Sequence, residues 1–230
     1  MPEIVDDGYW DRQRDELGMI LEELQPLYYV YCIGDCSTSG VGADRFWNYP
    51  SQLQEFLGRK YRVVNLGRTM LRMETLQTFT EVFEEKIKNG GFVCVWCGSN
   101  DIYWGVLAET VGAWLSEFCR RLRNRGLIVI VMTMLPRTAI GFGSDLIPEK
   151  IEADRIIFNN WLNENYPEFA DAIIDFSDSS EIGYPGAEKD VKYYREDNNT
   201  HLNNLGYEIV AGMVHKKIKE LAKPIAKECI

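Results

Sequence analysis

The sequence lacks the features that mark several large classes of protein. Its 230 residues carry 25 Lys and Arg against 35 Asp and Glu, which gives a net charge of −10 at pH 7. This balance argues against binding to nucleic acid or to an anionic membrane surface, because both need clustered cations that displace counterions. The longest strongly apolar run has roughly ten residues, far fewer than the ~20 of a membrane-spanning helix. A small neutral or sugar-like ligand suits this chain better.

Histidine is scarce, and the cysteines do not suggest a disulfide framework. There are two histidines and six cysteines, and Cys32, Cys94, Cys97 and Cys119 lie in apolar or helical stretches, as reduced buried cysteines do. Cys94 and Cys97 alternate along a predicted strand and should point to opposite faces, so we expect no shared metal ion and no cofactor. The first residues lack the pattern of a signal peptide, which favours a reducing, cytoplasmic location.

Short apolar runs alternate with longer amphipathic segments along the chain, as in βαβ units. The predicted strands are residues 28–34, 61–67, 92–98, 127–134 and 172–177. The predicted helices are residues 41–57, 72–88, 104–125, 149–165 and 205–223. Strands that are apolar nearly throughout are typical of a parallel sheet with helices on both faces. The sequence therefore predicts one α/β domain over residues 1–230, with a central parallel sheet and a helical extension over residues 1–25.

Reactive and polar residues gather where the predicted strands end. The stretches "GDCSTSG", "NLGRTM" and "GSND" each follow a strand, and "DNNTHLNNLGY" follows a long polar loop before the last helix. The carboxyl ends of parallel strands meet at one edge of an open sheet, where such sheets bind ligands. We therefore expect the functional site at this edge.

In this order, the four stretches resemble the sequence blocks of the SGNH (GDSL-type) hydrolases, a family of esterases, lipases and acetylhydrolases. The resemblance implies a flavodoxin-like, three-layer α/β/α fold with about five strands. It also implies hydrolysis of a small carboxylic ester, such as an O-acetyl or short acyl group on a carbohydrate, through a covalent acyl-enzyme. By position it makes Cys36 the nucleophile and His201 the base. The backbone N–H groups of Cys36 and Gly67 and the Asn100 side chain would form the oxyanion hole, which stabilises the charge that develops in acyl transfer.

Two positions depart from the family pattern. Cys36 stands where the family has Ser, and Asn198 stands three residues before His201, where the family has Asp. In a serine triad, Asn in place of Asp can lower kcat by about 10⁴. A thiol has a lower pKa than a hydroxyl, and a helix N-terminus with a nearby histidine would favour the thiolate further. We therefore hypothesise one coherent Cys36, His201 and Asn198 site, with a thiolate and an imidazolium in the resting state.

The sequence alone leaves several alternatives open. Asp197, one residue before Asn198, could orient His201 instead. Cys36 could be an engineered replacement of Ser, or Ser37 could be the nucleophile. The site could also have lost catalysis and serve as a ligand- or carbohydrate-binding module.

Other residues near the predicted edge could contact a substrate. We expect Arg68, Tyr103 and Arg137 to bind it, and packing is the alternative role for each aromatic ring at this edge. The further aromatic candidates are Trp104, Tyr184 and Tyr194. His215 falls inside the last amphipathic helix and is expected to pack or to lie on the surface. The expected partner is thus a small ester or an acylated carbohydrate, and the sequence does not predict an oligomeric state.

Overall fold

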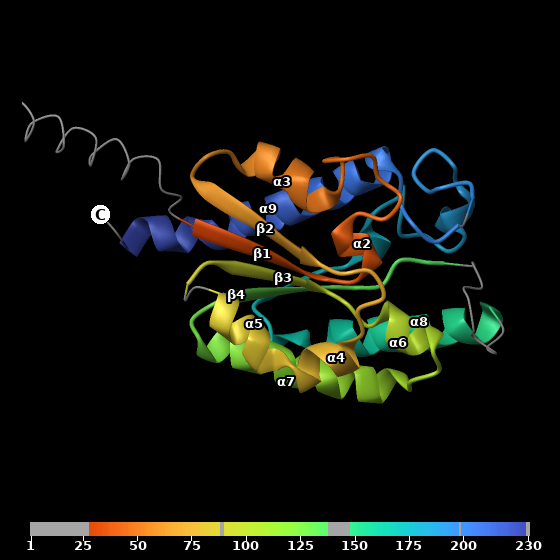
Figure 1. Ribbon diagram of the computed structural model, residues 1–230, viewed down its shortest axis with the longest axis horizontal. Helices are drawn as coiled ribbons and strands as arrows, with labels where there is room; N and C mark the ends of the chain where they lie inside the picture. The colour runs from red at the N-terminus through yellow and green to blue at the C-terminus, as the bar shows by residue number, and fades with distance from the viewer. Residues whose placement is uncertain (1–27, 88–89, 138–147, 198, 229–230) are drawn as a thin grey trace, which may run out of the picture.

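The computed structural model describes residues 28–87, 90–137, 148–197 and 199–228. Their centre is a five-stranded parallel sheet with the strand order β2-β1-β3-β4-β5 (Figure 1). The strands are β1 (Tyr28–Gly34), β2 (Tyr61–Gly67), β3 (Phe92–Trp96), β4 (Ile128–Met132) and β5 (Ala172–Ile174). The predicted parallel sheet is confirmed. Residues 1–25, where we expected a helical extension, lie outside the described residues.

Helices cover both faces of the sheet, which confirms the three-layer α/β/α fold (Figure 1). One face carries α2 (Cys36–Ser39), α3 (Tyr49–Leu57) and α9 (Asn204–Glu228). The other face carries α4 (Met73–Thr78), α5 (Thr80–Lys86), α6 (Ser99–Tyr103), α7 (Ala108–Asn124) and α8 (Pro148–Asn165). Three short 3₁₀-helices, η1 (Tyr166–Glu168), η2 (Phe176–Asp178) and η3 (Ala187–Lys189), lie between α8 and α9.

Local backbone geometry explains where the predicted helix boundaries were wrong. The helix expected over residues 41–57 begins only at Tyr49, because Gly42 has a φ of 98° and the Asn48 side chain caps α3 by accepting from Ser51 N–H. In place of the single helix predicted over residues 72–88, the structure has α4 and α5, which meet at Phe79. Gly105, with a φ of 84°, separates α6 from α7.

The hydrophobic core is divided by the sheet into two clusters. Cys94 belongs to the cluster that includes residues of α3 and α9, whereas Cys97 belongs to the cluster on the α7 side. The predicted opposite orientation of these two cysteines is therefore confirmed. The cysteines of the described residues are all free and buried. Among the described helices, none combines the length and the apolar character that crossing a bilayer requires.

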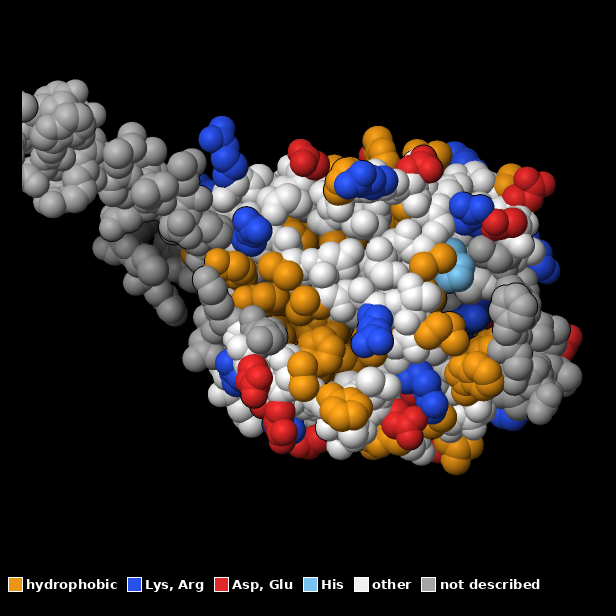
Figure 2. All heavy atoms as spheres, viewed as in Figure 1, with side chains coloured by type: hydrophobic (Ala, Val, Ile, Leu, Met, Phe, Trp, Pro, Cys, Tyr) orange, Lys and Arg blue, Asp and Glu red, His pale blue; other side chains and the backbone are white. Residues whose placement is uncertain are grey.

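Some apolar side chains remain uncovered on one face of the molecule. Figure 2 shows hydrophobic side chains gathered on the face where β2, α4 and α5 lie in Figure 1. Met70, Phe79 and Val82, which follow β2 in the chain, are all more than half exposed. Strand β2 is an edge strand, and Val64 and Leu66 within it are only half buried. The helices thus protect the middle of the sheet better than its β2 edge.

Candidate active site

Cys36 begins α2 directly after β1, at the carboxyl edge of the sheet. Asp35 caps this helix, since its Oδ1 accepts a hydrogen bond of 2.9 Å from Ser37 N–H. Gly34 has no room for a side chain: a Cβ there would lie 2.1 Å from the Trp96 carbonyl oxygen. Thr38 is fully buried beneath the turn. Close backbone packing therefore determines where the Cys36 thiol lies.

Gly67 ends β2 beside this turn, where it pairs in register with Gly34. A Cβ on Gly67 would lie 2.2 Å from Ser39 N, so glycine is required for β2 to approach α2 this closely. The Gly67 N–H, an expected oxyanion donor, donates to Asn65 Oδ1 at 2.8 Å. A substrate oxygen must therefore displace the exposed Asn65 Oδ1 before it can accept a hydrogen bond from Gly67 N–H.

Asn100 and Asp101 have different partners, and neither caps the helix that contains them. Asn100 is buried, and its Nδ2 donates to the Leu71 carbonyl at 2.9 Å, which leaves the second amide hydrogen for another acceptor. Asp101 is fully buried and accepts from Met73 N–H at 2.7 Å and from Glu74 N–H at 3.3 Å. It thereby caps α4, so Asp101 is a structural residue. Asn100 remains available as an oxyanion donor.

The loop before α9 brings His201 to the same edge. Tyr194 and Leu202 form an antiparallel bridge, and Arg195 N–H donates to the His201 carbonyl at 2.9 Å. The loop packs on Gly42, where a Cβ would lie 3.0 Å from His201 Cβ. The loop thereby places His201 at the edge of the sheet where Cys36 begins α2.

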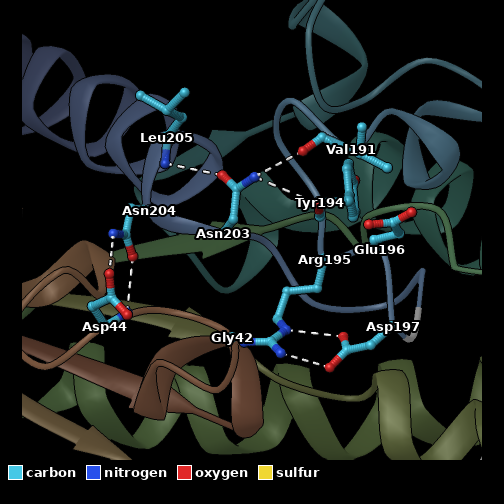
Figure 3. A pocket seen from close by; sticks show the side chains of 10 residues that line it. All are labelled: Gly42, Asp44, Val191, Tyr194, Arg195, Glu196, Asp197, Asn203, Asn204 and Leu205. Atoms are coloured by element: carbon cyan, nitrogen blue, oxygen red, sulfur yellow. Dashed lines mark hydrogen bonds and ion pairs between the residues drawn. The ribbon is translucent and has the colours of Figure 1, made fainter.

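A pocket of about 710 Å³ lies along the outer side of this loop (Figure 3). Asn203 holds its wall together, because its Nδ2 donates to the carbonyls of Val191 and Tyr194 while its Oδ1 accepts from Leu205 N–H at the start of α9. Asn204 and Asp44 connect the same wall to the chain after α2 through two hydrogen bonds. The histidine loop is thus fastened by these polar contacts near the surface as well as by the buried side chains of Tyr194 and Leu202.

Of the two residues that could orient His201, only Asp197 lies among the described residues. Asp197 is exposed, and both of its carboxylate oxygens accept from Arg195, at 2.9 and 2.6 Å (Figure 3). This ion pair lowers the pKa of Asp197. Asn198, the residue expected to orient His201, lies outside the described residues. The identity of the orienting residue therefore stays a prediction.

A second, much smaller pocket lies directly beside Cys36. Its volume of about 20 Å³ leaves room for roughly one water molecule. Its lining residues are Asp35, Cys36, Ser37, Trp96, Ser99, Met134, Leu135, Arg137 and Thr200. Because Thr200 precedes His201, the histidine block and the nucleophile block meet here. Ser99 and Thr200 were not singled out from the sequence, although both lie inside quoted motifs.

The predicted substrate-binding residues are dispersed. Arg137 lies in the small pocket, where its Nη1 donates to Ser99 Oγ at 3.2 Å and its guanidinium lies 4.7 Å from the centroid of the Tyr103 ring. Tyr103 is buried under Arg137 and supports it.

Arg68 has an exposed side chain outside the lining of this pocket. Tyr194 is a packing residue, since its ring is buried and its hydroxyl donates to the Ile182 carbonyl at 2.6 Å. The remaining aromatic candidates, Trp104 and Tyr184, are exposed.

Burial opposes ionisation of both predicted catalytic groups. It raises the pKa of the Cys36 thiol to about 12, and the nearby Asp35 carboxylate adds to this effect. Burial also lowers the pKa of His201 to about 4, helped by the positive charge of Arg137 and opposed by Asp197. Burial therefore disfavours the expected thiolate and imidazolium pair in the resting site, and the pair stays a prediction. The start of α2 and Arg137 do favour the thiolate, but desolvation outweighs them.

Comparisons with known proteins agree with the fold and the order of the blocks. The model of the GDSL-like Lipase/Acylhydrolase family matches residues 32–209. A member of the lipolytic protein G-D-S-L family from Veillonella parvula is 16% identical, with a TM-score of 0.59 over 82% of this chain and 97% of that chain. The esterase EstA from Pseudoalteromonas sp. is 12% identical, with a TM-score of 0.61 over 84% and 97% of the two chains.

An acetyl xylan esterase, AlAXEase, is 17% identical, with a TM-score of 0.60 over 82% of this chain and 98% of that chain. Identities this low show a shared fold and leave the substrate open. The comparison with curated proteins found no significant match.

Proposed function

The chain belongs to the GDSL-like lipase/acylhydrolase family and is an esterase-type hydrolase; on this premise, we propose that it cleaves a small carboxylic ester through a covalent acyl-enzyme on Cys36. One observation carries the proposal: Cys36 and Thr200, the residue before His201, line the same small pocket although they are far apart in sequence. Following the resemblance described above, the proposed substrate carries a short acyl group, such as an O-acetyl group on a carbohydrate.

The proposed reaction has two steps. Cys36 Sγ attacks the ester carbonyl while His201 takes the thiol proton, and the negative oxygen is bound by the Cys36 N–H, the Gly67 N–H and Asn100. The alcohol then leaves with the proton from His201, and a thioester remains on Cys36. In the second step His201 takes a proton from water as the water oxygen attacks the thioester; the C–S bond then breaks, His201 returns the proton to Cys36 Sγ, and the carboxylic acid is released.

The raised pKa of Cys36 and the lowered pKa of His201 decide how the first proton moves. With a neutral thiol and a neutral imidazole at pH 7, proton transfer must accompany the attack, as in serine hydrolases. This resting state is the one that a hydroxyl nucleophile also uses. We therefore expect Cys36→Ser to retain turnover, whereas Cys36→Ala should have none above background.

Hydrolysis of p-nitrophenyl acetate by the wild type, Cys36→Ser and Cys36→Ala tests the proposal. Mass spectrometry of the acid-quenched wild type should detect an acetyl group on Cys36, since thioesters survive acid. Turnover that is equal in all three proteins would overturn the role of Cys36. Absence of turnover in both the wild type and Cys36→Ser would favour a binding module that retains the fold. A Cys36→Ser variant much faster than the wild type would indicate that the thiol replaces an ancestral or natural serine.

A further inference from the structure

Arg137 is a positively charged group in the small pocket, and the described residues use only part of its hydrogen-bonding capacity. A guanidinium has five N–H donors. One of them donates to Ser99 Oγ, and the Nε of Arg137 is buried with no hydrogen-bond acceptor among the described residues. Tyr103 covers one face of the guanidinium. Such an arrangement holds the cation in one orientation and leaves donors available for a ligand.

Asp35, a candidate counter-ion that lines the same pocket, has hydrogen bonds to other groups. Its Oδ1 caps α2 through Ser37 N–H, and its Oδ2 accepts from Ser99 Oγ at 3.2 Å. Ser99 therefore lies between the carboxylate and Arg137. The two charges attract each other, but no ion pair between Arg137 and a carboxylate is found among the described residues. Burial lowers the pKa of Arg137, which reflects a desolvation cost that an anionic ligand would offset.

Arg137 also lies on the side of Cys36 away from Gly67. The strand order places β2 on one side of β1 and β3 and β4 on the other, and Arg137 follows β4 whereas Gly67 ends β2. If the ester carbonyl oxygen points to Gly67, a different part of the substrate faces Arg137. The lining of the small pocket contains Arg137 and excludes Gly67 and Asn100.

We infer that Arg137 binds an anionic oxygen group of the substrate, so that the site prefers esters with a carboxylate or phosphate close to the scissile bond. This inference rests on the proposed ester hydrolysis and specifies its substrate class. The volume of about 20 Å³ leaves room for one anionic oxygen beside Arg137. In a protein with a net charge of −10, a local cation is also what an anionic substrate needs to bind.

Matched ester pairs separate the possible positions of the anion. Monomethyl succinate and dimethyl succinate differ in a charge on the acyl side, and 4-acetoxybenzoate and its methyl ester differ in a charge on the alcohol side. The proteins compared are the wild type, Arg137→Gln, Arg137→Lys and the control Arg120→Gln, which removes an arginine from the exposed surface of α7. The readout is kcat/KM for each ester at constant ionic strength.

We expect the wild type to prefer the anionic ester in at least one pair. Arg137→Gln should lower kcat/KM for that ester by about 10- to 100-fold more than for its neutral partner, the value of one or two charge-assisted hydrogen bonds. Arg137→Lys should recover part of the preference, because it keeps the charge without the planar fork. Arg120→Gln should behave like the wild type.

The inference is overturned if the wild type shows no preference for the anionic ester of either pair, or if Arg137→Gln lowers kcat/KM equally for both esters of each pair. Hydrolysis of the neutral esters would then leave the proposed function intact. If no ester is hydrolysed, the proposed function fails, and the melting temperature in the presence of succinate or inorganic phosphate decides on anion binding. Either anion should raise the melting temperature of the wild type more than that of Arg137→Gln, and equal shifts would count against the inference.

Discussion

The nucleophile side and the histidine side of the site are built in different ways. Cys36 is held by buried backbone, with Gly34 against the Trp96 carbonyl and Gly67 against α2. His201 is half buried in a loop that combines buried anchors, Tyr194 and Leu202, with exposed polar contacts such as those of Asn204 with Asp44. The position of the thiol therefore depends on closely packed backbone, whereas the position of the imidazole depends on both core packing and surface hydrogen bonds.

This difference in construction nevertheless produces the same electrostatic result on both sides. Desolvation raises the pKa of Cys36 and lowers that of His201, so both groups are neutral near pH 7. A neutral pair avoids the cost of burying two charges, and it leaves the proton on sulfur until a substrate arrives. The site thus resembles a serine hydrolase in electrostatics although its proposed nucleophile is a thiol.

The largest effect should come from removing the base on the histidine side. His201→Gln should lower kcat/KM for p-nitrophenyl acetate by about 10²- to 10⁴-fold, the usual contribution of general base catalysis. His215→Gln is the matched control, because this second histidine lies in α9, 6.0 Å from the centroid of the Phe56 ring. A similar loss in both variants would indicate damage to the fold, and full activity of His201→Gln would exclude it as the base.

The next largest effect should come from disturbing the packed backbone on the nucleophile side. Gly34→Ala places a Cβ 2.1 Å from the Trp96 carbonyl oxygen, and overpacking of this kind costs about 1–3 kcal/mol or more in the free energy of unfolding. Urea denaturation measures this loss. Gly212→Ala in α9 is the control, since its Cβ would meet nothing within 4 Å and alanine favours a helix over glycine by about 0.5–1 kcal/mol. Equal stability of the two variants would contradict the close contact at Gly34.

The pH dependence of kcat/KM reports on His201, and the pH dependence of alkylation reports on Cys36, so both sides of the site can be compared in one protein. With the pKa of His201 lowered to about 4, kcat/KM should stay nearly level from neutral pH down to about pH 5 and fall below that. A histidine with the ordinary pKa of ~6.5 would lose about nine-tenths of its base form by pH 5.5. Alkylation of Cys36 by iodoacetamide should rise about tenfold per pH unit without a plateau below pH 10, since its pKa is raised to about 12.

The same shift in His201 has a consequence for stability. Its pKa is lower in the folded protein than in the unfolded chain, so the unfolded chain binds more protons below pH 6.5. The stability contributed by the neutral imidazole is therefore present above about pH 6.5 and is lost as the pH falls towards 4. An activity limb near pH 6.5, or a thiol that reacts with a plateau near pH 8.5, would contradict the neutral pair.

Much of the fold could be predicted because its strands are continuous apolar runs. The bounds of β1 and β2 coincide with the predicted residues 28–34 and 61–67. The helix boundaries were less predictable, because they depend on positive φ angles at Gly42 and Gly105 that amphipathic patterns do not reveal. The start of α3 had a local signal in Asn48 followed by Pro50, which a closer use of capping rules could have found.

The candidate site was predictable in composition but not in its electrostatics. The sequence blocks predicted that Cys36, Gly67 and Asn100 lie at the ends of strands, and the structure has them there. The direction of the Cys36 pKa shift depends on how deeply the thiol is buried between β1, Trp96 and Arg137, which are far apart in sequence. The hydrogen bond from Gly67 N–H to Asn65 Oδ1 is likewise a feature of side-chain orientation that spacing does not determine.

The smallest effect should come from the surface contacts of the histidine side. Asp197→Asn removes a carboxylate that is exposed and already paired with Arg195, so we expect kcat/KM to change by less than about threefold, as for other exposed ion pairs. The matched control is Glu196→Gln, a neighbouring acidic residue that lines the same pocket. Because Asp197 raises the pKa of His201, the acid limb should move slightly to lower pH in Asp197→Asn and less in the control. A fall in kcat/KM approaching the ~10⁴-fold known for triad aspartates would instead make Asp197 the residue that orients His201.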